Sequence, residues 1–241
     1  MILTDPNARP IVAHRGASGE APENTLLAFE RGLELGADAF ECDVRLSSDG
    51  IPVVIHDQTL DRTTDGTGAV NNLTAKDLAL LDAGSGQGIP SVEQVLESFA
   101  EIPIIIEVKE IPAARPLAEV IRRHGAKDRV LVGSFLHAAL GCFEEFGIRR
   151  CASQRQTAAF WAGSRLRVAL GASAYTALSV PVYHRGVRVA DQAFVRTATR
   201  RGLPVHVWTV DERAEAERLR ALGIAGIITN WPDRMTGLSR S

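Results

Sequence analysis

The sequence predicts an α/β fold, a single (β/α)₈ TIM barrel domain that takes in residues 1–241. Two observations predict this fold. About eight short apolar runs alternate with helical segments, and strands that alternate with helices form a parallel sheet. One run, PIIIEVK at 103–109, is almost continuously β-branched, which is typical of a strand covered on both faces. About eight such units in 241 residues fit a closed barrel.

An open, doubly wound sheet is the alternative fold for the same alternation of strands and helices. A dinucleotide-binding sheet of that kind carries a G-x-G-x-x-G motif after its first strand. The first apolar run, PIVAH at 10–14, is followed by RGASGE, which does not match that motif. The sequence therefore favours the closed barrel.

Apolar periodicity and turn residues place the individual elements. Strands are expected at 10–14, from Phe40 onward, and at 103–109, 130–134, 149–153, 177–183, 204–210 and 226–229, with a return strand at 52–55. Helices are expected at about 25–35, 91–100, 116–124, 136–146, 191–201 and 211–222, with 155–172 helical or irregular. Asn24 or Thr25 is expected to cap the first helix, and Asp211 to cap the last. The loop-rich stretch 59–88 is expected to leave the main fold as a small cap.

Composition and charge exclude several classes of function. The net charge is −2 and no block of basic residues occurs, which argues against a nucleic-acid partner. The chain has no apolar run near the roughly 18 residues that span a bilayer and no leader-like start, so we expect a cytoplasmic protein without membrane insertion. Three cysteines without CxxC spacing indicate a reducing compartment and no zinc site.

Two acidic residues on one strand form the first part of a candidate metal site. Side chains two apart on a strand point to the same face, so Glu41 and Asp43 lie side by side. Glu107, near the end of the 103–109 strand, is expected at the same mouth of the barrel. Three converging carboxylates repel one another unless a cation lies between them. Because all the ligands are oxygens, a divalent cation such as Mg²⁺ or Ca²⁺ is expected.

Cationic groups and histidines surround the predicted metal site. Arg15 and Lys109 add positive charge suited to a phosphate. His14 and His56 follow strands and can serve as general acid and general base near neutral pH. Trp208 is a candidate substrate-binding residue that could wall the pocket. Together these groups predict hydrolysis of a phosphodiester.

The motifs resemble those of the glycerophosphodiester phosphodiesterase family over nearly the whole chain. The segments that carry the resemblance are HRGASGEAPENT, ECDVRLSSDGIPVVIHDQTLDRTTDGTG, IEVK, VHVWTV and GIITNWPD. The resemblance implies a barrel with a small insertion after the second strand, at about 57–100, and a small-molecule glycerophosphodiester as substrate. It also implies site roles, with metal ligands Glu41, Asp43 and Glu107, an acid–base pair His14 and His56, and phosphate contacts Arg15 and Lys109.

The implied chemistry starts with attack of a substrate glycerol hydroxyl on phosphorus, assisted by one histidine while the other protonates the leaving alcohol. A cyclic phosphate then opens with water to give glycerol 3-phosphate. At further motif positions, we expect Asn24 to orient the His14 loop and Asp57 to shape the turn after His56. Two alternatives remain open, a phosphodiesterase for lysophospholipids or inositol headgroups and a barrel that binds phosphorylated ligands without turnover.

Overall fold

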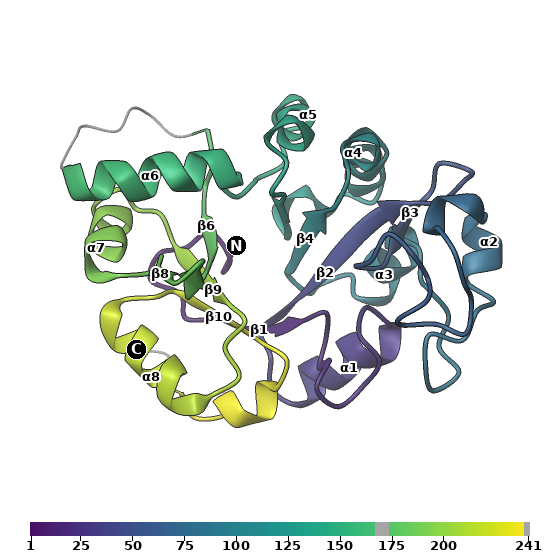
Figure 1. Cartoon of the computed structure of the whole chain (residues 1–241), viewed down its shortest axis with the longest axis horizontal. Coiled ribbons are helices and arrows are strands. Elements are labelled where there is room, and N and C mark those ends of the chain that lie inside the picture. The colour runs from purple at the N-terminus through teal and green to yellow at the C-terminus, as the bar shows by residue number, and fades with distance from the viewer. Residues whose placement is uncertain (167–173, 239–241) are drawn as a thin grey trace.

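The computed structural model describes residues 1–166 and 174–238, and its strands form a nearly closed parallel barrel (Figure 1). The strands lie in the order β5-β4-β2-β1-β10-β9-β6, and each neighbouring pair is parallel. Their bounds are β1 Ile11–His14, β2 Ala39–Leu46, β4 Ile104–Val108, β5 Val130–Gly133, β6 Leu178–Pro181, β9 Val205–Trp208 and β10 Gly226–Thr229. A short strand, β3 (Pro52–Val54), pairs antiparallel with β2. The predicted α/β barrel is thereby confirmed.

Two single bridges close the ring between β5 and β6. Arg150 bridges to Val132 on one side, and Cys151 bridges to Ala177 on the other. The backbone N–H of Cys151 donates to the carbonyl of Val132 at 2.8 Å. The expectation of a regular strand at 149–153 is wrong, because the chain passes from one neighbour to the other within two residues and forms no continuous ladder.

Helices cover the outside of the barrel, and most begin where the sequence predicts (Figure 1). Thr25 caps α1, since its hydroxyl accepts from the backbone N–H of Ala28 at 3.2 Å. Asp211 does not cap α8, because its carboxylate accepts instead from the backbone and side-chain amides of Asn230, each at 2.8 Å. The helices are α1 Leu26–Glu34, α2 Ala75–Leu78, α3 Val92–Ser98, α4 Ala114–Arg123, α5 Gly141–Glu145, α6 Gln154–Leu166, α7 Gln192–Arg200 and α8 Arg213–Leu222. Short 3₁₀ helices cover Val70–Asn72, Ile111–Ala113, Ala126–Asp128, His137–Leu140 and Pro232–Met235.

Separate apolar clusters fill the space between the barrel and its helices. One draws its buried residues from 13–148 and the other, apart from Ile11, from 152–238. A smaller cluster fills the barrel interior, and it includes Leu3 and Ile105. None of the helices in the described ranges is long and apolar enough to cross a membrane.

The lower end of the barrel, which we call the floor, consists of Leu3, His206 and Gly226. His206 is fully buried, and its Nε2 lies 2.8 Å from the carbonyl oxygen of Leu3, so Nε2 carries the proton. Gly226 pairs with His206 across β10 and β9, and a Cβ at Gly226 would stand 1.9 Å from the Nδ1 of His206. His206 and Trp208 lie two residues apart on β9 and share a face, but only Trp208 lines the cavity at the mouth.

The segment between β3 and α3 has a small apolar cluster of its own. Its buried members are Val53, Ile55, Leu60, Val70, Leu78 and Ile89. Helix α3 lies inside the 57–100 range but packs in the main core through Val92, Val95 and Leu96. A hairpin of β7 (Tyr183–His184) and β8 (Val187–Arg188) follows β6. Of the 155–172 stretch, 155–166 belong to α6, and 167–172 lie outside the described residues.

Candidate active site

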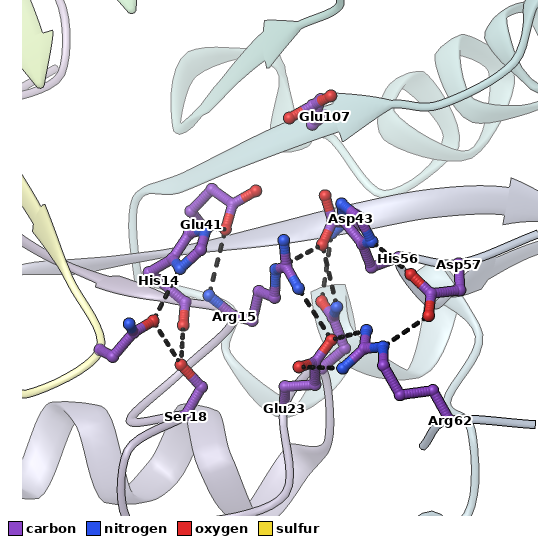
Figure 2. Close-up of polar contacts among 12 residues, drawn as sticks. His14, Arg15, Ser18, Glu23, Glu41, Asp43, His56, Asp57, Arg62 and Glu107 are labelled. Atoms are coloured by element: carbon purple, nitrogen blue, oxygen red, sulfur yellow. Dashed lines mark hydrogen bonds and ion pairs between the residues drawn. The ribbon is translucent and has the colours of Figure 1, made fainter. Parts of the chain in front are cut away.

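Strand register brings the predicted acidic residues and His14 together at the upper end of the barrel. His14 ends β1 and pairs with Glu41 on β2, while Asp43 pairs with Glu107 on β4. Because β1, β2 and β4 are neighbours in the sheet, all four side chains meet at one mouth. The polar groups labelled in Figure 2 lie at this mouth, with Glu107 on the strand beyond Asp43.

Three carboxylates form an acidic cluster that could hold a metal ion. Ligand atoms of Glu41, Asp43 and Glu107 lie within 4.8 Å of one another. Burial raises the pKa of Glu41 well above its usual range, and the charges of Asp43 and Glu107 raise it further. Burial likewise raises the pKa of Glu107. An oxygen-only donor set of this kind fits a hard divalent cation, whose charge would relieve the repulsion.

Lys109 and Arg15 lie against this acidic cluster. The ammonium of Lys109 stands 2.9 Å from Oδ1 of Asp43 and 2.8 Å from Oε1 of Glu107. Nε of Arg15 stands 3.1 Å from Oδ2 of Asp43. Burial favours a higher pKa for Asp43, but Lys109 and Arg15 outweigh it and hold that pKa below its usual value. Asp43 is therefore the member of the cluster best adapted to stay ionised.

Asn24 supports Asp43 directly. Its side-chain amide donates to Oδ2 of Asp43 at 3.0 Å and accepts from the backbone N–H of Asp43 at 3.1 Å. The backbone N–H of Asn24 donates to the carbonyl of Arg15 at 3.0 Å, which ties Asn24 to the loop after His14, while its side chain serves Asp43. Asn24 adopts a positive φ of 61°, which asparagine tolerates better than most residues.

His14 is oriented by a pair of residues at the ends of β9 and β10. Its Nδ1 lies 2.7 Å from Oδ1 of Asn230, whose Nδ2 donates to Asp211 at 2.8 Å. Because Asp211 accepts from the amide nitrogen, the oxygen of Asn230 must face His14, and Nδ1 of His14 is the donor. Burial, followed by the charge of Arg15, lowers the pKa of His14. The neutral ring then leaves Nε2 free to accept a proton, 3.9 Å from Oε2 of Glu41.

His56 has a carboxylate partner instead of an amide. Its Nδ1 lies 2.6 Å from Oδ1 of Asp57, and Oδ2 of Asp57 accepts from Nε of Arg62 at 2.5 Å. The hydrogen bond from Arg62 is the main cause that lowers the pKa of Asp57. Arg62 also binds Glu23, which binds Arg15, so a chain of ion pairs crosses the mouth from His56 (Figure 2).

A cavity of about 610 Å³ opens beside these groups. Seven of the eight predicted site residues line it directly, namely His14, Arg15, Glu41, His56, Glu107, Lys109 and Trp208. Asp43 is buried behind them with 1% of its surface exposed. The ring of Trp208 contacts that of Phe135 edge to face, with centroids 5.9 Å apart. Gln154, the first residue of α6, also lines the cavity.

Sequence reasoning missed the supporting pair Asn230 and Asp211 and the ion-pair residues Glu23 and Arg62. Asn230 directly follows β10, and Asp211 comes shortly after the end of β9. Their position at the carboxyl ends of parallel strands was the available signal, because barrel sites form at that face. Glu23 and Arg62 come from loops, and only the folded chain brings them together.

The fold and the mouth together define the class, a (β/α)₈ barrel protein with an acidic, histidine-flanked site. The sequence model of the Glycerophosphoryl diester phosphodiesterase family matches residues 14–234. The chain belongs to this family, and the resemblance read from its motifs is confirmed.

Relatives and solved structures agree with this assignment. The chain is 33% identical to a glycerophosphodiester phosphodiesterase of Caldanaerobacter subterraneus over 95% of this chain and 97% of that one. It is 30% identical to a glycerophosphodiester phosphodiesterase of Bacillus subtilis, over 96% and 86% respectively. A glycerophosphodiester phosphodiesterase from Agrobacterium tumefaciens superposes with a TM-score of 0.77 at 27% identity, over 94% of this chain and 98% of that one.

A phosphodiesterase from Oleispira antarctica, solved in complex with its product sn-glycerol-3-phosphate, also superposes with a TM-score of 0.77. It is 27% identical over 95% of each chain. The enzyme class predicted from the sequence, a glycerophosphodiester phosphodiesterase, is confirmed at the level of the family.

Proposed function

We propose that this chain hydrolyses glycerophosphodiesters to glycerol 3-phosphate and an alcohol, with a divalent metal ion and two histidines. The observation that carries the proposal is the acidic cluster, in which ligand atoms of three carboxylates lie within 4.8 Å of one another. Glu41 and Glu107 of this cluster line the same cavity as His14 and His56. The names of the relatives and the product complex of the Oleispira protein support the substrate class.

Glu41, Asp43 and Glu107 would hold the ion, as their oxygen donors suit Mg²⁺ or Ca²⁺. A bound ion would stabilise negative charge on the phosphoryl oxygens. Arg15 and Lys109 line the cavity beside the cluster and would bind the same phosphoryl group. Both cations already contact Asp43, which holds their charge at this edge of the cavity.

The two histidines would move the protons. Nε2 of neutral His14 is the free acceptor, which suits removal of the proton from the attacking glycerol hydroxyl. Nδ1 of His56 is paired with the carboxylate of Asp57, which orients the ring, and His56 would donate a proton to the leaving alcohol. Attack by a hydroxyl that belongs to the substrate needs no protein nucleophile and benefits from high effective molarity. Water then opens the cyclic phosphate.

Release of glycerol 3-phosphate from glycerophosphocholine and glycerophosphoethanolamine tests the proposal. We expect release that stops with EDTA and returns with Mg²⁺ or Ca²⁺. We also expect at least a ~10²-fold fall in His14→Ala and in His56→Ala, the usual scale for loss of a general acid or base. His124→Ala is the matched control, because His124 binds Glu93 and does not line the cavity.

Each result separates one part of the proposal from the rest. Release that is unaffected by EDTA would contradict the metal site. Wild-type rates in His14→Ala would contradict its catalytic role. Binding of glycerol 3-phosphate without any turnover would support the alternative, a barrel that only binds phosphorylated ligands.

A further inference from the structure

His56 is the less enclosed of the two histidines at the mouth. Its side chain is 33% exposed, against 17% for that of His14. Packing alone fixes such a ring poorly, so its orientation depends on the hydrogen bond between its Nδ1 and Asp57. The backbone of His56 has a separate support, because Nε of Arg45 donates to the carbonyl of His56 at 2.8 Å. The group that holds Asp57 therefore decides where the ring points, and not where the chain runs.

Arg62 holds Asp57 and Glu23 at the same time. Its Nε donates to Oδ2 of Asp57 at 2.5 Å, and its two Nη atoms donate to the two carboxylate oxygens of Glu23 at 2.9 and 2.8 Å. Because the guanidinium is planar and rigid, it fixes the angle between the two carboxylates, which a single ammonium group cannot do. Oδ1 of Asp57 is then left to face Nδ1 of His56.

The turn that carries Arg62 is anchored inside the insertion. Leu60 is fully buried in the small apolar cluster of this segment. The carbonyl of Leu60 accepts from the backbone N–H of Thr64 at 3.1 Å and from its hydroxyl at 2.9 Å, which closes the turn around Arg62. Residues 57–100, all of which the structure describes, contribute no side chain to the lining of the 610 Å³ cavity. The insertion reaches the site through the ion pairs of Arg62 and Asp57 instead.

We propose that Arg62 is a positioning residue that fixes the His56 ring through Asp57, so that the ring faces the phosphoryl group. This inference rests on the proposed function. A general acid must lie within hydrogen-bond reach of the leaving oxygen, and a small displacement of the group slows the reaction. Figure 2 shows Arg62 between Asp57 and Glu23. Arg62 does not line the 610 Å³ cavity, so it acts through its neighbours.

The phosphate-binding end of the ion-pair chain has its own support. Nη1 of Arg15 lies 2.9 Å from Glu23, and its Nε lies 3.1 Å from Asp43. Arg15 therefore stays tied to two carboxylates when Arg62 is removed. Asp57, in contrast, loses the guanidinium that orients it. This asymmetry predicts a loss in kcat with little change in KM.

Arg62→Ala tests this prediction with glycerophosphocholine as substrate. We expect kcat to fall roughly tenfold and KM to change by less than about twofold. Arg31→Ala is the matched control, because Arg31 also binds two carboxylates, those of Glu20 at 2.9 Å and Glu34 at 3.1 Å. The side chain of Arg31 is 41% exposed, against 49% for Arg62, and it does not line the 610 Å³ cavity. Arg31→Ala should keep the wild-type kcat and KM.

Rescue experiments separate positioning from a general loss of structure. A second cavity, of about 430 Å³, borders Arg62 and Glu23, so a guanidinium ion can reach the place of the missing side chain. Millimolar guanidinium chloride, below denaturing concentrations, should restore about half of the kcat lost in Arg62→Ala, whereas NaCl at equal ionic strength should not. The kcat of Arg62→Lys should lie between those of the wild type and Arg62→Ala.

A double variant tests whether Arg62 acts through Asp57. If it does, Arg62→Ala combined with Asp57→Asn should have the kcat of Asp57→Asn alone, because the second change removes the only step through which the first one acts. Losses that multiply would overturn the route through Asp57.

The remaining outcomes also decide between roles. An unchanged kcat in Arg62→Ala would overturn the inference and leave the proposed function standing. A raised KM at unchanged kcat would overturn it in favour of a role in substrate binding. If neither lysine nor guanidinium restored any kcat, the loss would come from a changed insertion, and the positioning role would be overturned. A wild-type protein without turnover of any glycerophosphodiester would overturn the proposed function, and this inference with it.

Discussion

The two ends of this barrel each hold a histidine, half-buried at the mouth and fully buried at the floor, and the two rings have opposite surroundings. At the mouth, His14 has an amide partner on Nδ1 and presents Nε2 to a cavity that carries two carboxylates. At the floor, His206 donates from Nε2 to a backbone carbonyl and has no exposed surface. Desolvation lowers the pKa of both rings, but only the ring at the mouth has a nitrogen that a ligand can reach.

The surroundings differ as much as the histidines do. The mouth brings carboxylates together, and burial and the neighbouring negative charges raise the pKa of Glu41. This arrangement costs stability. The floor gathers apolar side chains around Leu3 and contains no carboxylate among its three defining residues. We conclude that the mouth is organised for chemistry and the floor for stability. Variants should therefore separate activity from stability.

The largest effect is expected at the mouth. Glu41→Gln should lower kcat/KM on glycerophosphocholine by at least ~100-fold, because it removes a charged ligand from the proposed metal site. The raised pKa of Glu41 means that the folded state disfavours its ionised form at pH 7, so a neutral side chain should stabilise the metal-free fold by roughly 1 kcal/mol. Urea denaturation in EDTA measures this gain. Glu30→Gln, on the exposed face of α1, is the control.

A destabilised or fully active Glu41→Gln protein would contradict the contrast between the two ends. The first result would mean that the carboxylate holds the fold together. The second would mean that the acidic cluster needs only two ligands.

At the floor, the expected effect concerns stability as a function of pH. Burial and, to a smaller extent, the charge of Arg220 lower the pKa of His206 to about 4, whereas the unfolded ring titrates near ~6.5. Between these values the unfolded state binds more protons, so the free energy of unfolding falls as the pH falls. The wild type should lose about 3 kcal/mol more than His206→Gln between pH 7 and pH 4. Urea unfolding at several pH values measures the difference, and parallel curves would refute it.

A smaller effect is expected from the glycine that packs against this ring. Gly226→Ala places a Cβ 1.9 Å from Nδ1 of His206, so the floor must shift. Overpacking of this kind costs about 2 kcal/mol, while kcat of the folded protein should stay unchanged. Gly133→Ala is the control for stability, since its Cβ would meet no atom within 4 Å. If Gly226→Ala changed kcat more than thermal stability, the two ends would not be independent.

The smallest effect is expected for the positioning of His14. Asn230→Ala removes one hydrogen bond to Nδ1, which is worth about 1 kcal/mol, so kcat should fall roughly fivefold with little change in KM. Ser18→Ala is a useful comparison, because the hydroxyl of Ser18 also lies 2.7 Å from Oδ1 of Asn230, and its bond to His14 goes to the backbone carbonyl. An unchanged kcat in Asn230→Ala would show that packing alone orients the ring.

Much of the mouth could be predicted because its residues lie on regular strands. Alternation along β2 places Glu41 and Asp43 on one face, and the order of strands brings Glu107 beside them. The supports of these residues could not be predicted in the same way. Asp211 lies just before a helical segment, as a capping residue does. Only the folded structure shows that its carboxylate accepts from Asn230, at the end of the neighbouring strand, and not from the helix.

The apolar side of the cavity, which includes Phe135, Trp161 and Val187, left no signal in the sequence, because it consists of single residues from separate segments. Each of them resembles an ordinary surface or core residue in its own segment. The irregular strand pairing at 149–153 could not be predicted either, because an apolar run predicts a strand but not how many of its residues pair with each neighbouring strand. Sequence patterns therefore reveal chemistry that a strand carries, and they miss surfaces that tertiary structure assembles.

Among the residues that the structure describes, the barrel is closed between β5 and β6 only by the single bridges at Arg150 and Cys151, and we call this weakly paired place the seam. The two main apolar clusters divide at nearly the same place, since one ends at Ile148 and the other, apart from Ile11, begins at Ala152. The molecule is in this respect two half-barrels joined through β1 and its neighbours. New chain termini placed at the seam would leave each half with its own hydrophobic interior, which makes it the natural point for circular permutation or for a split enzyme that reassembles.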